Sequence, residues 1–496
     1  MLKYFFTLAL ISTLSVFVGS HASDAASLEC EALATQDLTG LMNAPTRITS
    51  ASIVPASGDS PEYCGVTGYV ASQIQFEVRL PTSGWNGNYF QTGCGGFCGV
   101  IPIDGCAQAL SQGFAVAAEN SGHTGANTFD ALWASDNRNA EIDFAYRSPY
   151  VVSVAAKELI RLFYDAPAEK SYFQGCSTGG RQALMMAQRF PEAFDGIVAG
   201  NPALLQNYLA TIAQGYLEKV NRDVDGKIIL PVDKLPLLNE AVMAACDAKD
   251  GRTDGVIDDP ASCSFDPEVL TCAEGQEVTQ CLSRAQISVV NAFYDGAPDE
   301  NGEPLFAGLA RGSELGWGVF NFSIGTDDRM SGSGQYATQV LKYLAFETDP
   351  DPSFSLADFD HQDPENRVKL EYMAQIYNAD DPDLSAFQAA GGKLIVYHGL
   401  ADPLITPFET INYYEKSAGM SGGIGATQDF FRLFMLPGVY HCRGGPGSDQ
   451  VDWLTAIRSW VENDVAPDQI TARKLEEAQV TQERILYPYP KLPDLE

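Results

Sequence analysis

A serine stands at the apex of a predicted strand-turn-helix connection. The motif Gly-Cys-Ser-Thr-Gly at residues 175–179 follows the short apolar segment 172–174 and precedes a helical pattern that begins at Arg181. Glycines permit a turn tight enough to lift Ser177 out of a sheet, and the following helix points its N-terminus at the same place. The bare motif is short enough to occur by chance, but the strand and the helix on either side favour a real turn of this kind.

Short apolar strands alternate with helical patterns over much of the chain. This alternation indicates an α/β fold, in which a parallel sheet is covered by helices on both faces. The expected strands are 63–70, 74–80, 88–92, 114–118, 172–174, 196–199, 394–397 and 431–436, and the expected helices are 151–163, 181–190, 408–416 and 453–460.

The alternation is interrupted in the middle of the chain. Between about residues 204 and 384 the sequence becomes loop-rich, acidic and dense in cysteine. A chain of 496 residues is long enough for a large domain that carries an insertion. We therefore expect a main domain made of residues 23–203 and 381–496, with an inserted domain over residues 204–380.

The N-terminus has the features of a secretory signal. A lysine near the start, the apolar run 4–18 and a small-residue site ending at Ala22 follow one another in the order of a cleavable signal peptide, here residues 1–22. The apolar run is shorter than the roughly 20 residues needed to span a bilayer. The sequence therefore predicts a secreted or periplasmic protein that is not anchored in a membrane, with disulfides among its eleven cysteines and at least one cysteine left over.

The strong negative charge limits the possible partners. The formal net charge is −33 and the isoelectric point is about 4.3. Nucleic acids and anionic membrane surfaces are themselves negative, so neither is an expected partner. Solubility in an exported or saline setting explains the acidity without reference to a substrate.

Few residues are available to activate Ser177. The chain has five histidines, and His21 would leave with the signal, so the candidates for a general base are His123, His361, His398 and His441. Of these, His441 lies in a loop just after the strand 431–436, late in the chain, where a fold with this serine motif places its base.

The predicted acid is Asp402, which lies in the loop after the strand 394–397. It would hold His441, which would take the proton of Ser177 as the serine attacks a carbonyl. The alternative for Asp402 is a helix N-cap before Pro403. Cys176 is a poor nucleophile candidate, because it lies off the apex of the turn.

Backbone amides would stabilise the oxyanion that such an attack produces. One donor is expected from Thr178, and a second from Gly95 or Gly96 in the glycine-rich loop after the strand 88–92. A dinucleotide-binding loop is a weaker interpretation, since no helix with an acidic residue about 20 positions further on completes that pattern. His398 is expected either to line a substrate pocket or to be a structural histidine at a strand end.

Two cysteines stand beside the predicted nucleophile and base. Cys176 precedes Ser177 and Cys442 follows His441. The base must come within about 3 Å of the nucleophile, and adjacent α-carbons are about 3.8 Å apart, so these cysteines would be close enough to form a disulfide. The pair predicts that two distant segments meet at one site.

An acidic loop at residues 246–258 places carboxylates at short intervals with glycines between them. Hard oxygen ligands on such a loop suit Ca²⁺, with backbone carbonyls completing the coordination. The spacing does not match an EF-hand, and an ordinary solvated acidic turn is the alternative. Cys246 and Cys263 bracket the loop and could close it, which favours a structural metal over a catalytic one.

Taken together, Gly-Cys-Ser-Thr-Gly-Gly-Arg at 175–181, His-Gly-Leu-Ala-Asp at 398–402 and His-Cys at 441–442 resemble the tannase and feruloyl esterase family, which also contains mono(2-hydroxyethyl) terephthalate hydrolases. The resemblance covers nearly the whole mature chain. It implies an α/β-hydrolase fold with a large lid inserted between the nucleophile and the acid, and no organic cofactor.

The resemblance also implies particular pairings and ligands. It implies disulfides Cys176–Cys442, Cys30–Cys64, Cys246–Cys263 and Cys272–Cys281, and it leaves Cys94, Cys98 and Cys106 unmatched. The implied calcium ligands are the side chains of Asp247, Asp250 and Asp254 and the carbonyls of Arg252 and Val256.

The expected activity is hydrolysis of small esters of aromatic acids, hydroxycinnamic or gallic, through an acyl-enzyme on Ser177. Hydrolysis of terephthalate monoesters or other aryl esters is the nearest alternative. An amidase or peptidase, and a non-catalytic binding relative, are more distant ones. Lid residues around Trp317 are expected to line an apolar slot for the aromatic ring.

Overall fold

The protein is built on one large sheet. The structure is a computed structural model that describes Met1 and residues 28–125 and 129–491, so residues 2–22 of the expected signal peptide lie outside the described residues. The nine-stranded sheet has the order β1-β2-β3-β5-β4-β6-β7-β8-β9, and β10 pairs with β11 separately. The strands are β1 Thr46–Val54, β2 Tyr63–Val70, β3 Ile74–Pro81, β4 Asn88–Thr92, β5 Ala115–Glu119, β6 Lys170–Cys176, β7 Gly196–Gly200, β8 Lys393–Gly399, β9 Phe431–Leu436, β10 Ile470–Glu476 and β11 Gln479–Leu486.

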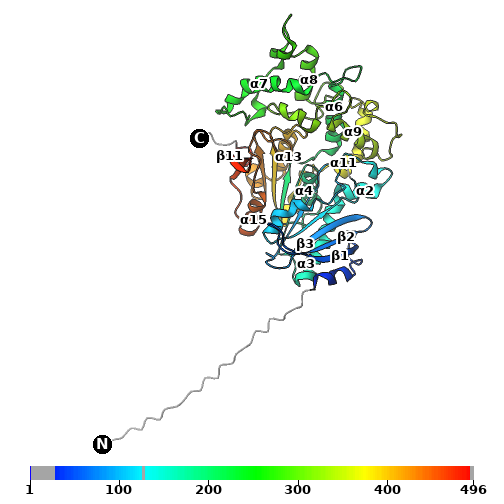
Figure 1. Cartoon of the computed structure of the whole chain (residues 1–496), viewed down its shortest axis with the longest axis vertical. Coiled ribbons are helices and arrows are strands. Elements are labelled where there is room, and N and C mark those ends of the chain that lie inside the picture. Colours follow the sequence, from blue (N-terminus) through cyan, green and yellow to red (C-terminus); the bar gives the residue numbers. More distant parts are fainter. Residues whose placement is uncertain (2–27, 126–128, 492–496) are drawn as a thin grey trace.

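Helices cover both faces of the sheet, as the alternation predicted (Figure 1). In β8, Leu394 and Val396 pack with the helices over residues 148–164, 178–189 and 407–420. Ile395 and Tyr397 point to the opposite face and pack with the helix over residues 453–463. Alternate residues of a strand face opposite sides, so a strand buried on both sides reads as a continuous apolar run. The α-helices are α1 Ala107–Ser111, α2 Arg138–Ile142, α3 Ser148–Tyr164, α4 Thr178–Arg189, α5 Gln206–Tyr208, α6 Gln214–Val220, α7 Leu235–Cys246, α8 Arg284–Asp295, α9 Gly332–Tyr343, α10 Pro364–Lys369, α11 Glu371–Tyr377, α12 Ser385–Ala389, α13 Pro407–Met420, α14 Ile424–Thr427 and α15 Trp453–Asn463.

The expectation of a parallel sheet is wrong at one edge. Strands β4 to β9 pair in parallel, but β1, β2 and β3 pair antiparallel with one another, and β3 is antiparallel to β5. The connection of residues 71–73 between β2 and β3 is too short for the crossover that parallel neighbours need. The sheet is therefore mixed.

The long segment between β7 and β8 adds no strand to the sheet within the described residues. Helices α7 and α8 in this segment contribute to a separate hydrophobic cluster whose members all lie between Leu217 and Ile324, and they lie at the end of the molecule opposite β1 (Figure 1). The division into a main domain and an inserted domain stays a prediction. None of the helices in the described part of the chain is long and apolar enough to cross a membrane.

Candidate active site

The turn that carries Ser177 is strained and closely packed. Ser177 joins β6 to α4 with φ 65° and ψ −123°, a conformation that costs a non-glycine residue on the order of 1–3 kcal/mol and is typical of functional turns. Its N–H donates to the Gly200 carbonyl oxygen at 2.9 Å. A Cβ on Gly175 would lie 2.5 Å from the Gly179 carbonyl oxygen. Gly175 is therefore needed for β6 and α4 to approach this closely, whereas a Cβ on Gly179 would meet the backbone of Gly93 and Cys94.

Asp402 and His441 form a hydrogen-bonded pair. His441 Nδ1 lies 2.7 Å from Asp402 Oδ2. The Asp402 side chain is fully buried and also accepts hydrogen bonds from Asn201 Nδ2 at 2.7 Å and from the backbone N–H groups of Leu404 and Ile405 at 2.8 and 3.0 Å. Burial opposes ionisation, but the charges and hydrogen bonds of the neighbouring histidines outweigh it and hold the pKa of Asp402 well below its usual range. A carboxylate fixed in this way orients the imidazole.

Ser177 and His441 meet at one cavity. The Cys176–Cys442 disulfide joins the residues next to them, and both side chains line a cavity of about 720 Å³. Within the described part of the chain, the hydrogen bond recorded for the His441 side chain is the one to Asp402. Contacts between a base and a nucleophile often tighten only when substrate binds.

The other candidate histidines lie elsewhere, within the described part of the chain. His123 stacks on Trp133 and His361 packs edge-on against Tyr216, and neither lines the cavity. His441 is therefore the histidine that the structure brings to Ser177.

His398 does not line the cavity, so the pocket role expected for it is not what the structure gives. Its side chain is fully buried. Nε2 lies 2.9 Å from the Ile405 carbonyl oxygen and 3.3 Å from Asp402 Oδ2, and Nδ1 lies 2.8 Å from the Thr410 hydroxyl. A carbonyl oxygen only accepts, so Nε2 carries a proton. His398 therefore helps to hold the buried Asp402 carboxylate in place.

The predicted oxyanion residues lie together at the cavity. Gly95, Gly96, Ser177 and Thr178 all line it, and the Thr178 hydroxyl donates to the Gly96 carbonyl oxygen at 2.7 Å. This hydrogen bond ties the glycine-rich loop to the first residue of α4. Backbone N–H groups from two segments can therefore converge beside the serine, which is the arrangement an oxyanion needs.

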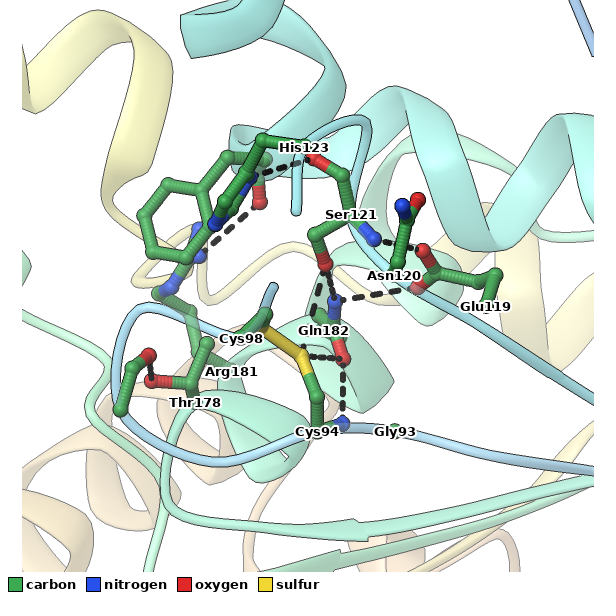
Figure 2. Close-up of a disulfide and its surroundings, with 12 residues drawn as sticks. Gly93, Cys94, Cys98, Glu119, Asn120, Ser121, His123, Thr178, Arg181 and Gln182 are labelled. Atoms are coloured by element: carbon green, nitrogen blue, oxygen red, sulfur yellow. Dashed lines mark hydrogen bonds between the residues drawn. A yellow bond between two sulfur atoms is a disulfide. The ribbon is translucent and has the colours of Figure 1, made fainter. Parts of the chain in front are cut away.

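The glycine-rich loop is pinned against α4 (Figure 2). A Cβ on Gly93 would lie 2.7 Å from the Gly179 Cα, so the two backbones are in contact. A disulfide joins Cys94 to Cys98, and the Cys94 N–H donates to the side-chain oxygen of Gln182 at 3.2 Å. The sequence left the pairing of Cys94, Cys98 and Cys106 open, and the structure pairs Cys94 with Cys98. Cys106 remains as a buried free thiol whose pKa is raised by burial.

A buried carboxyl lies beneath this loop. Gln182 Nε2 donates to the Ser121 hydroxyl at 3.1 Å and to Glu119 Oε1 at 3.4 Å, and the Ser121 N–H also donates to Glu119 (Figure 2). Burial raises the pKa of Glu119 from 4.5 to about 7, against the opposing effect of its hydrogen bonds. Gln182 therefore links the Glu119 carboxyl to the backbone of the glycine-rich loop.

The pH dependence of stability should reveal this group. Folded Glu119 keeps its proton to about pH 7, whereas the unfolded chain loses it near pH 4.5, so the folded state binds more protons between these values and stability falls as pH rises. We expect the wild type to lose about 3 kcal/mol relative to Glu119→Gln between pH 4 and pH 8. Denaturant unfolding of both proteins across this range measures the difference. Burial also raises the pKa of Glu141 to about 7, but Glu141 is present in both proteins, so its contribution cancels in the difference. Parallel profiles of stability against pH for the two proteins would contradict the prediction.

The cavity wall is mainly apolar and comes from several parts of the chain. Residues after the C-terminal ends of β4, β5, β6, β8 and β9 line it, together with residues between β7 and β8. A cavity with apolar walls and few polar groups suits a small aromatic ligand. The apolar and aromatic lining residues include Phe129, Leu209, Val319, Phe322, Tyr336, Leu404, Ile405 and Tyr440.

Trp317 is not part of this wall. Its side chain is fully buried in the hydrophobic cluster between β7 and β8, against Phe293 and Tyr294, and Nε1 donates to the Ser313 hydroxyl at 2.9 Å. The expectation that Trp317 forms the aromatic slot is therefore wrong, because its ring packs within the core and its N–H has its hydrogen-bond partner there. Phe322 and Val319, a few residues later, reach the cavity instead.

The acidic loop folds on itself. Asp247 accepts from the N–H groups of Asp254 and Gly255 at 3.3 and 3.1 Å, and Asp250 accepts from the Asp258 N–H at 3.0 Å. The described residues contain no group of three or more His, Cys, Asp or Glu side chains placed to hold a metal ion.

The guanidinium of Arg484 neutralises part of this loop. It is buried and pairs with Asp254, at 2.7 Å, and with Asp258. The Cys246–Cys263 disulfide closes the loop, and the expected Cys30–Cys64 and Cys272–Cys281 disulfides also form.

Asn201, beside the site, and Arg484, at the acidic loop, were not anticipated from the sequence. Asn201, which holds Asp402, follows β7 directly, and its position at the same end of the sheet as Ser177 was the available signal. Arg484 gave no signal, because its partners lie far away in the sequence and the pairing exists only in the folded chain.

The chain matches a known family over most of its length. The family model described as tannase and feruloyl esterase matches residues 61–496. A mono(2-hydroxyethyl) terephthalate hydrolase from Piscinibacter sakaiensis is 34% identical, covering 89% of this chain and 84% of that protein. A probable feruloyl esterase B-2 from Aspergillus flavus is 32% identical over 83% of this chain and 80% of that protein.

Solved structures similar to this chain have names of the same kind as these relatives. Feruloyl esterase B from Aspergillus oryzae superposes with a TM-score of 0.82 at 28% identity, covering 94% of this chain and 96% of that chain. The tannin acyl hydrolase from Aspergillus niger has a TM-score of 0.70 at 23% identity, covering 90% and 87%, which supports the fold alone. These relatives are all carboxylic ester hydrolases by name.

Proposed function

Because the chain belongs to the tannase and feruloyl esterase family, we propose that it is a serine carboxylic ester hydrolase that cleaves esters of aromatic acids. The observation that carries the proposal is the buried Asp402 bonded to His441, with His441 and Ser177 lining one cavity with largely apolar walls. Esters of hydroxycinnamic or gallic acids are the proposed substrates.

Each group has a part in the proposed reaction. His441 takes the proton as the Ser177 oxygen attacks the ester carbonyl, and the N–H groups of Thr178 and of Gly95 or Gly96 stabilise the oxyanion. The alcohol then leaves with the proton from His441, and the acyl group remains on Ser177. Water, activated by the same histidine, releases the acid.

The architecture supports an α/β-hydrolase assignment with the segment 204–380 as a lid. Ser177, Asp402 and His441 occur in the chain order of that fold, and each follows the C-terminal end of a parallel strand. The segment supplies cavity-lining residues, such as Leu209 and Phe322. We also propose export, on the basis of the signal-like residues 1–22 and the five disulfides.

Terephthalate monoesters and other aryl esters are the alternative substrates, supported by the similarity to the terephthalate enzyme. An amidase would use the same residues, and a non-catalytic relative would usually lack one of them. The test is hydrolysis of feruloyl, galloyl, terephthaloyl and simple aryl esters, with matched amides, by the purified protein. The proposal fails if none of the esters is cleaved in a Ser177-dependent manner.

We further propose a structural Ca²⁺ in the acidic loop. The chemistry of the donors fits, since the carboxylates of Asp247, Asp250 and Asp254 and the carbonyls of Arg252 and Val256 are hard oxygen ligands. The side chains do not gather into a metal-binding group in the described structure, and Arg484 pairs with Asp254. Binding would therefore require these side chains to rearrange, and no step of the proposed reaction depends on the ion.

Removal of the metal should destabilise the protein without blocking the site. We expect EDTA to lower the melting temperature by about 4 °C or more, and added Ca²⁺ to restore it, because a ligand held only by the folded state stabilises that state. Thermal unfolding with and without the chelator measures the shift. The variant Asp250→Asn should respond less than the wild type, and identical melting temperatures with EDTA and with Ca²⁺ would contradict the proposal.

A further inference from the structure

Gln182 holds the glycine-rich loop from the helix that begins directly after Ser177. Its side chain is fully buried in α4, and Oε1 accepts from the Cys94 N–H at 3.2 Å. A Cβ on Gly93 would lie 2.7 Å from this oxygen, so the loop backbone rests directly on the amide. The Gln182 amide therefore holds the main chain of the loop rather than one of its side chains.

The amide of Gln182 is itself fixed from the other side (Figure 2). Its Nε2 donates to the Ser121 hydroxyl at 3.1 Å and to Glu119 Oε1 at 3.4 Å. In the opposite orientation of the amide, Nε2 would face the Cys94 N–H, and two donors cannot form a hydrogen bond with each other. The contacts therefore select the orientation in which Oε1 points to the loop.

The backbone N–H groups of the loop have different partners. The Gly93 N–H donates to the Gln174 carbonyl oxygen at 2.9 Å, and the Cys94 N–H donates to Gln182. Within the described part of the chain, the N–H groups of Gly95 and Gly96 have no recorded acceptor. Both glycines line the cavity together with Ser177. The backbone is thus held at Cys94, directly before the two N–H groups that remain available to an oxyanion.

Two further contacts stabilise the loop. The Cys94–Cys98 disulfide links the loop to itself, and the Thr178 hydroxyl links Gly96 to the start of α4. Helix α4 therefore carries the Thr178 N–H and also holds the loop, through Thr178 at one point and Gln182 at another. Loss of the Gln182 contact would free the loop at Cys94 to shift relative to this helix.

We propose that Gln182 is a positioning residue for the reaction. By holding the Cys94 N–H, it sets where the N–H groups of Gly95 and Gly96 stand relative to Ser177. The inference rests on the proposed ester hydrolase function and deepens it by assigning the residue that places these donors. Their contact with the substrate strengthens as negative charge develops on the carbonyl oxygen, so misplaced donors lower kcat and leave KM nearly unchanged.

The first test is the variant Gln182→Met, which keeps the length of the side chain and removes both polar groups. We expect kcat for a simple aryl ester to fall by about 10–100-fold, because a small displacement of the oxyanion donors is costly. KM should stay within about twofold of the wild-type value. Steady-state kinetics of the purified, folded protein measure both constants.

A rescue experiment tests the hydrogen-bond chain itself. Gln182→Glu places a second carboxyl against Glu119 and should also lower kcat. Adding Glu119→Gln exchanges the two groups, so that an amide at position 119 donates to a carboxylate at position 182, which still accepts from the Cys94 N–H. The double variant should recover kcat to within about threefold of the wild type, as expected for two residues that act as one unit.

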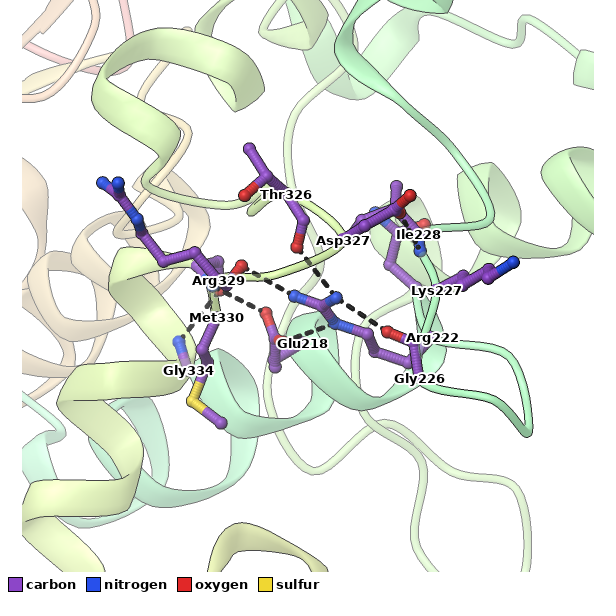
Figure 3. Close-up of polar contacts among 12 residues, drawn as sticks. Glu218, Arg222, Gly226, Lys227, Ile228, Thr326, Asp327, Arg329, Met330 and Gly334 are labelled. Carbon is purple, nitrogen blue, oxygen red and sulfur yellow. Dashed lines mark hydrogen bonds and ion pairs between the residues drawn. The ribbon is translucent and has the colours of Figure 1, made fainter.

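A second polar network provides a control (Figure 3). Arg222, just after α6, pairs with Glu218 at 2.8 Å and donates to the carbonyl oxygens of Thr326 at 2.9 Å and Arg329 at 2.8 Å. It holds a loop between β7 and β8 as Gln182 holds the glycine-rich loop, but neither Arg222 nor Glu218 lines the cavity around Ser177. Arg222→Met should therefore lower the melting temperature and keep the wild-type kcat.

The outcomes separate this role from the proposed function. If folded Gln182→Met keeps the wild-type kcat, or if Arg222→Met loses as much kcat as Gln182→Met, the positioning role is overturned while Ser177-dependent hydrolysis stands. If Gln182→Met fails to fold, the comparison of Gln182→Glu with the double variant decides, and a double variant no more active than Gln182→Glu overturns the role. If the wild type cleaves no ester in a Ser177-dependent manner, both are overturned.

Discussion

The Ser177→Ala variant is expected to lose ester hydrolysis by a factor of about 10⁴–10⁶ in kcat while remaining folded. In the proposed mechanism the serine oxygen forms the acyl-enzyme, and no other side chain at the turn can replace it. Alanine adopts the positive φ of this position about as readily as serine does, so the strained turn at φ 65° should persist. Turnover of a feruloyl, galloyl or simple aryl ester by the purified proteins measures the loss.

A matched control is Ser111→Ala, at an exposed position at the end of α1, which should keep wild-type activity. Thermal unfolding of Ser177→Ala should resemble that of the wild type. Retained hydrolysis by a folded Ser177→Ala protein would remove Ser177 from the mechanism and the acyl-enzyme with it.

The second large effect is expected from the disulfide beside the site. Replacing Cys176 and Cys442 by alanine opens a link between residues 266 positions apart. On the chain-entropy model, this lowers the free energy of unfolding by about 5–6 kcal/mol. We also expect kcat to fall by about 10–100-fold, because the link positions the segments of Ser177 and His441 relative to each other. Denaturant unfolding and ester turnover measure the two effects.

The Cys272–Cys281 disulfide offers a comparison, since its cysteines are 9 positions apart and line no part of the cavity. Its double alanine variant should lose about 2–3 kcal/mol of stability and keep full activity. Equal stability losses for the two pairs, or unchanged activity without Cys176–Cys442, would show that the bridge beside the site has no special role.

Much of the parallel part of the sheet could be predicted from the sequence. The bounds expected for β4 and β9 agree with the structure, because their apolar runs end at clear turns. By contrast β1 and β11 were missed, since most of their residues are exposed and give no apolar pattern. An edge strand is recognised by its hydrogen-bonded neighbour, and that neighbour is not visible in the local sequence.

The residues of the candidate site also include some that the sequence could predict and some that it could not. Ser177, Asp402 and His441 could be named together, because loops after neighbouring parallel strands meet at one edge of the sheet. Trp317 was misplaced, since an apolar side chain looks the same in a sequence whether it fills a core or lines a cavity.

The strand order places one polar group at the end of each of four neighbouring strands. Ser177 follows β6, Asn201 follows β7, Asp402 comes after β8 and His441 after β9. The spacing of these four groups follows from the distance between neighbouring strands in a sheet, about 4.8 Å. Residues 204–380 contribute to the cavity wall but add no strand to the sheet, so they leave this spacing unchanged. Evolution can therefore lengthen or rewrite that segment, and so change which ester fits, without moving the atoms that react.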